Sequence, residues 1–237
     1  MNIYAFPYAV GTKSIFNEMK DLIIGAKLVA MEYPGHGTRF NQQLCGSIRE
    51  LVEDAYDQIK DNLDKPYFLL GYSMGALVAF ELFRLIESYN RRLPERIFLL
   101  ASDSPEEQNI PYKCTNMNIE LQRQILSEFG NTPDEVLENV ELLSLISPIL
   151  ESDLNMINDY KNEMHGVKYM KGPVTIIRGT EEKSAQTSKI GWQKYIACEV
   201  EFILVEGDHF FLFNNKTSLH NCIKIIMRNI RRDELIS

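Results

Sequence analysis

The chain has 237 residues, of which 45% are hydrophobic, and a formal net charge of −8. This length is enough for one domain with a large core, and no apolar run is long enough to cross a membrane. The negative charge argues against nucleic acid and anionic membranes as partners, because both repel an acidic surface.

The N-terminal residues and the cysteines indicate the compartment. Residues 1–6 lack the basic start and the long apolar stretch of a signal peptide. The four cysteines show no CxxC or other metal-like spacing; they are Cys45, Cys114, Cys198 and Cys222. We therefore expect free thiols, no metal site and a cytoplasmic location.

The first third of the chain alternates between strand and helix. Residues 2–6 and 27–33 are predicted strands, with a predicted helix at 14–24 between them. Residues 48–63 carry apolar side chains at helical spacing.

A predicted buried strand at 67–71 is followed by Gly-x-Ser-x-Gly at 71–75 and by an apolar helix at 75–89. This order is typical of a nucleophile elbow, in which a serine is exposed on a tight strand-to-helix turn. Glycines flank the serine because the turn brings backbone too close for a Cβ. We therefore predict Ser73 as a nucleophile and the Met74 N–H as an oxyanion donor.

After a predicted strand at 96–101, the segment 115–165 contains no strand-like run and predicts short helices at 120–129, 133–139 and 141–160. It is unusually apolar and lies between two strands, where a lid would be inserted. Ordinary packing onto the sheet and a cover over an acyl-binding groove are both open interpretations. We call 115–165 the lid segment.

The remaining strands are predicted at 174–177 and 200–205, with a last helix at 216–230. Of the four histidines, His209 follows the strand 200–205 on a loop. His36 lies in an early loop, His165 in a polar stretch and His220 inside the last predicted helix. The place of His209 matches the base of an α/β-hydrolase sheet, whose chain order is serine, acid, histidine. We predict His209 as the base.

The acid should follow a strand between the serine and the histidine. The turn after 174–177 offers Glu182 and Glu181, and the strand 96–101 is followed by Asp103. We rank Glu182 first, Asp103 second and Glu181 third. The alternating strands and helices predict an α/β fold, with a mostly parallel sheet covered by helices on both faces and an inserted helical lid.

The sequence resembles the type II thioesterases that accompany nonribosomal peptide and polyketide synthases. Five segments match that family's motifs in order along nearly the whole chain: 6–11 (FPYAVG), 33–40 (YPGHGTRF), 71–76 (GYSMGA), 145–160 with Pro148, Asp153 and Tyr160, and 207–212 (GDHFFL). The chain departs from the family at Tyr8 and Tyr72, which replace histidines, at Val10, which replaces a glycine, and at Glu182, which replaces an aspartate.

This resemblance implies a single α/β-hydrolase domain over 1–237 that hydrolyses acyl thioesters on the phosphopantetheine arm of acyl or peptidyl carrier proteins. It also implies that the Ala9 N–H is a second oxyanion donor. We expect a monomer with no cofactor. The alternatives are a general carboxylesterase or lipase, which would share the triad, and a non-catalytic hydrolase-fold binding protein.

Overall fold

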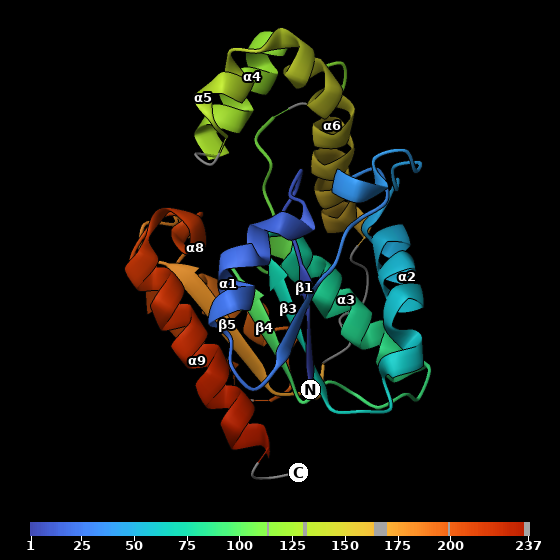
Figure 1. The fold of residues 1–237 in the computed structure, drawn as a ribbon, viewed down its shortest axis with the longest axis vertical. Helices are drawn as coiled ribbons and strands as arrows, with labels where there is room; N and C mark the ends of the chain where they lie inside the picture. The colour runs from blue at the N-terminus through green and yellow to red at the C-terminus, as the bar shows by residue number, and fades with distance from the viewer. Residues whose placement is uncertain (113, 130–131, 164–169, 199, 235–237) are drawn as a thin grey trace.

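The computed structural model describes residues 1–112, 114–129, 132–163, 170–198 and 200–234. Within these residues, six strands form one sheet in the order β2-β1-β3-β4-β5-β6, and all neighbouring pairs are parallel. The strands are β1 (Asn2–Phe6), β2 (Lys27–Ala30), β3 (Tyr67–Tyr72), β4 (Arg96–Leu100), β5 (Val174–Gly179) and β6 (Val200–Val205). Because they are parallel, their carboxyl ends share one edge of the sheet (Figure 1).

Alternate residues of the strands face two separate cores, as expected of a sheet covered on both sides. On one face, Leu69 and Leu99 pack with α2 (Ile48–Ile59), α3 (Met74–Ser88) and Trp192 of α7 (Ser188–Gln193). On the other, Leu70 and Leu100 pack with α1 (Asn17–Leu22), α8 (Phe211–Asn214) and α9 (Lys216–Glu234).

Most predicted elements are present. The predicted helix 14–24 is divided into a short 3-10 turn (Lys13–Phe16) and α1, and 48–63 into α2 and a second such turn (Lys60–Asn62). β2 is shorter than predicted and ends at Ala30. Further 3-10 turns at Gly37–Arg39 and Pro105–Glu107, and the short helices α7 and α8, were not predicted.

The lid segment enters the fold between β4 and β5. Its described residues form α4 (Ile119–Phe129), α5 (Asp134–Leu137) and α6 (Val140–Glu163), with Pro148 inside α6. Residues 130–131 and 164–165 of this segment lie outside the described residues. The three helices lie beyond the carboxyl ends of the strands, at the top of Figure 1.

None of the helices in the described ranges combines the length and the apolar character that a membrane span requires.

Candidate active site

Ser73 lies on a strained turn between β3 and α3. Its backbone has φ 54° and ψ −117°, a combination that residues with a side chain rarely adopt. A Cβ on Gly71 would lie 2.1 Å from the Gly75 carbonyl oxygen, and a Cβ on Gly75 would lie 2.1 Å from the Phe6 carbonyl oxygen. Both glycines are therefore required by close backbone approach, as an elbow demands.

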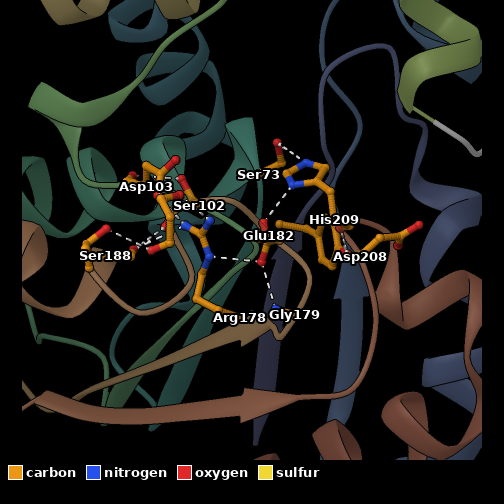
Figure 2. A network of polar contacts seen from close by, with 12 residues as sticks. Ser73, Ser102, Asp103, Arg178, Gly179, Glu182, Ser188, Asp208 and His209 are labelled. Carbon is orange, nitrogen blue, oxygen red and sulfur yellow. Dashed lines mark hydrogen bonds and ion pairs between the residues drawn. The ribbon is translucent and has the colours of Figure 1, made fainter.

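Three side chains from different loops form a hydrogen-bonded chain (Figure 2). His209 Nε2 lies 3.1 Å from Ser73 Oγ, and His209 Nδ1 lies 2.9 Å from Glu182 Oε1. Because a carboxylate only accepts, Nδ1–H donates to Glu182, which leaves Nε2 free to accept the serine proton. The Tyr72 hydroxyl donates to the His209 carbonyl and ties the histidine loop to the end of β3.

Glu182 is kept ionised although its side chain is only 4% exposed. Its second oxygen, Oε2, accepts hydrogen bonds from Arg178 Nε at 2.9 Å and from the Gly179 N–H at 2.8 Å. Burial would raise the pKa of Glu182, but the hydrogen bond from His209, the charge of Arg178 and the Gly179 bond together lower it.

The other acids considered from the sequence have different surroundings. Asp103 Oδ1 accepts from Arg178 Nη1 at 2.7 Å and from Ser184 Oγ at 2.5 Å, so its contacts are with Arg178 rather than with the imidazole. Glu181 is exposed. Among the candidates that the sequence offered, the structure brings Glu182 to His209.

The other histidines lie elsewhere. His36 is buried in the loop after β2, and His220 is exposed on α9 with Nδ1 2.7 Å from the Lys216 carbonyl oxygen. His165 lies outside the described residues.

A cavity of about 370 Å³ opens beside the serine. Ser73, His209 and Ala9 lie in its wall, and the lid segment contributes Phe129 and Leu154. Met74 is buried at the first position of α3, directly after the serine. A molecule in this cavity would therefore contact both Ser73 and the lid segment. The roles of the Met74 and Ala9 N–H groups as oxyanion donors remain predictions.

A buried pair joins the lid to the loop that contains Ala9. Asp153 of α6 accepts from the Val10 N–H at 2.6 Å, and the same oxygen lies 3.0 Å from His36 Nε2. The other ring nitrogen of His36 lies 3.0 Å from the Pro34 carbonyl oxygen. Burial would lower the pKa of His36, but its contacts with Asp153 and Pro34 raise it above the ordinary value.

Sequence reasoning did not identify Arg178 as part of the site. The available signal is a charged residue near the end of a fully buried strand, four positions before Glu182. Asp153 was recognised only as part of a lid motif, because a partner in a distant loop has no local pattern. Within the described residues, no group of three or more His, Cys, Asp or Glu side chains could hold a metal ion.

Comparison with known proteins adds the family. The model of the thioesterase domain matches residues 1–229. The gramicidin S biosynthesis protein GrsT of Aneurinibacillus migulanus is 25% identical, over 98% of this chain and 89% of its own length. The medium-chain S-acyl fatty acid synthase thioesterase of Homo sapiens is 24% identical, over 90% of this chain and 81% of its own length.

Solved structures share the fold. ClbQ from the colibactin NRPS/PKS pathway superposes with a TM-score of 0.87 at 21% identity, covering 100% of this chain and 99% of its own. RedJ, the thioesterase from the prodiginine pathway of Streptomyces coelicolor, gives 0.85 at 22% identity, covering 97% of this chain and 90% of its own. The predicted α/β-hydrolase fold is thereby confirmed.

Proposed function

The chain belongs to the thioesterase domain family, and we propose that it removes acyl groups from the phosphopantetheine arm of carrier proteins in nonribosomal peptide or polyketide synthesis. Family membership makes it a hydrolase of thioester bonds. We also propose an editing role, in which the enzyme clears acyl groups from misprimed or stalled synthases. The carrier-bound substrate and this role are supported by relatives such as GrsT, which is named for gramicidin S biosynthesis.

The observation that best supports this proposal is the hydrogen-bonded chain of Ser73, His209 and Glu182 in the wall of the cavity. In the proposed reaction, Ser73 Oγ attacks the thioester carbonyl carbon while His209 takes its proton and Glu182 stabilises the imidazolium. The imidazolium then protonates the departing thiolate. His209 then deprotonates a water molecule that attacks the acyl-serine carbonyl carbon. The bond from that carbon to Ser73 Oγ breaks, the imidazolium returns its proton to Oγ, and the acid is released.

The N–H groups of Met74 and Ala9 are the proposed donors to the oxyanion. Met74 directly follows the serine at the start of a helix, and Ala9 lines the same cavity. In comparable enzymes, removal of one such donor costs about 3–4 kcal/mol of transition-state stabilisation.

The proposed partner is an acyl or peptidyl carrier protein. The start of α6 exposes Val140, Leu142 and Leu145, an apolar surface that we propose as the contact for such a partner. We propose that the enzyme is a monomer. A cytoplasmic location is part of the proposal, since the four free cysteines suit a reducing compartment.

The experiment that tests the proposal compares kcat/KM for one acyl group presented on a carrier protein, on free pantetheine, on coenzyme A and as a p-nitrophenyl ester. We expect the carrier-bound thioester to be the best substrate, because contacts remote from the reacting carbonyl can contribute to kcat. Folded Ser73→Ala protein is the control for background hydrolysis.

Three results would contradict the proposal. Equal kcat/KM on the carrier protein and on free pantetheine would favour a general thioesterase, and preference for the p-nitrophenyl ester would favour a carboxylesterase. A wild-type protein whose Ser73 is not labelled by a fluorophosphonate would be a non-catalytic binding protein.

A further inference from the structure

The acid of the proposed triad is longer than the aspartate that the family resemblance leads one to expect. A glutamate has one more rotatable bond than an aspartate, so its carboxylate can take up more orientations. Hydrogen bonds to Oε2 therefore help to keep Oε1 directed at His209. Oε2 accepts from the Arg178 Nε–H at 2.9 Å and from the Gly179 N–H at 2.8 Å.

Arg178 is itself fixed on every side. It is 2% exposed, and its Nη1 donates to Asp103 Oδ1 at 2.7 Å and to Ser188 Oγ at 3.2 Å. Its Nη2 donates to Ser184 Oγ at 3.0 Å. Asp103 follows β4, Ser184 follows β5 and Ser188 begins α7. Figure 2 shows Asp103 and Ser188 beside the guanidinium. A planar guanidinium with this many hydrogen bonds cannot rotate, so it holds the Glu182 carboxylate in one orientation.

The charges also alternate. Asp103, Arg178 and Glu182 form two ion pairs in series, with the negative Glu182 at the end that faces His209. Arg178 alone would partly cancel the charge that stabilises the imidazolium of His209. Asp103 offsets Arg178, so the three groups together keep one net negative charge beside the base.

We infer that Arg178, held by Asp103, is a positioning residue that lets a glutamate act as the triad acid. The inference rests on the proposed function, since it needs Ser73 and His209 to be the reacting groups. Asp103, the second-ranked acid of the sequence, then has a different role, because it orients Arg178 and adjusts the charge felt by His209.

The test uses the full-length protein with three substitutions, Arg178→Met, Arg178→Lys and Asp103→Asn, and Arg49→Met as a control at an exposed position on α2. For each folded variant, kcat, KM and the pH dependence of kcat/KM are measured with an acyl-pantetheine. The acidic limb of that profile reports the protonation of His209 in the free enzyme. Other ionisable groups adjoin His209, namely Asp208 and Tyr72, or line the same cavity, namely Lys183, Glu128 and Tyr8. These variants leave all of them in place.

For Arg178→Met we expect kcat to fall at least about tenfold with KM nearly unchanged, because the carboxylate is no longer oriented. The acidic limb should move to higher pH by about half a unit or more, since Glu182 loses its neutralising partner. Asp103→Asn should move the limb the opposite way, to lower pH, with a smaller loss of kcat. Arg178→Lys should keep the limb near that of the wild type while kcat falls, because lysine retains the charge without the fork.

A folded Arg178→Met protein with wild-type kcat and pH profile would overturn the inference, as would limbs that shift in the same direction in Arg178→Met and Asp103→Asn. If Arg178→Met does not fold, the inference is still tested by the different kcat and pH limbs expected for Arg178→Lys and Asp103→Asn. The pH dependence of Ser73 labelling by a fluorophosphonate separates this inference from the proposed function, because labelling needs the base but no thioester substrate.

Discussion

Ser73 combines a strained backbone with a hydrogen bond to His209, so substitutions at these two positions test the reacting groups directly. Ser73→Ala should fold, because the elbow accepts a smaller side chain, and its kcat should fall below about a thousandth of the wild-type value. His209→Ala should be nearly as damaging. The double variant should lose little more than either single one, because the two side chains act as one unit.

His36→Ala is the matched comparison for that experiment. His36 is buried against Asp153 rather than hydrogen-bonded to the serine, so its substitution should affect stability more than the chemical step. Steady-state kinetics on folded protein at equal active-site concentration provide the measurement. A folded His36→Ala protein as inactive as His209→Ala would contradict the assignment of His209 as the base.

At the scale of elements, the pair of His36 and Asp153 links α6 to two loops and makes that link sensitive to pH. The folded-state pKa of His36 is raised, so the protonated histidine stabilises the fold fully below its ordinary pKa of 6.5. This stabilisation is lost as the pH rises through the raised value. Glu32 and Tyr33 also lie near the imidazole, and the negative charge of Glu32 favours its protonation.

Urea unfolding of the wild type and of His36→Gln measures this effect. The difference in free energy of unfolding between the two proteins should be larger at about pH 6 than at about pH 9. Comparing the two proteins removes the contribution of other groups that titrate in this range. A difference that stays constant or grows toward higher pH would contradict a protonated His36 in the folded protein.

The lid helices should be less stable than the sheet, and unevenly so. α4 packs mainly against the other lid helices α5 and α6, although its Ile125 and Leu126 join the main core, whereas α6 also packs against α2. Hydrogen exchange should therefore be fastest in α4, slower around residues 150–157 and slowest in β3 and β4. Equal protection of α4 and the central strands, in the free and the carrier-bound protein, would rule out a mobile lid.

At the scale of the whole molecule, one core joins the lid to the sheet, and we predict that the chain folds as a single domain. Leu143 and Leu150 of α6 share this core with Leu69, Leu99 and Trp192. Unfolding should therefore follow one cooperative transition, with coincident midpoints for far-UV circular dichroism and for the fluorescence of Trp192, the chain's one tryptophan. Two separated transitions would mean that the lid segment unfolds as a unit of its own.

The sequence allowed the strands, the elbow and the order of Ser73, Glu182 and His209 to be predicted, because buried apolar runs and a glycine-flanked serine are local patterns. The short helix α7 had no such pattern, since its place depends on the packing of Trp192. The contact of Asp103 with Arg178 also could not be predicted from the sequence. It requires β4 and β5 to be neighbours, and strand order is decided by the packing of the whole sheet.

The close approach of Gly75 to the Phe6 carbonyl oxygen has a consequence for how this protein can evolve. Any side chain at position 75 would push the serine turn away from the loop after β1. A substitution there would therefore require compensating substitutions in that loop. Phe129 and Leu154, from the insertion between β4 and β5, reach the cavity with side chains rather than backbone. Apolar substitutions that conserve volume are tolerated better there than a Cβ at position 75. Descendants of this chain can therefore acquire new acyl preferences by varying the insertion while inheriting the chemistry unchanged.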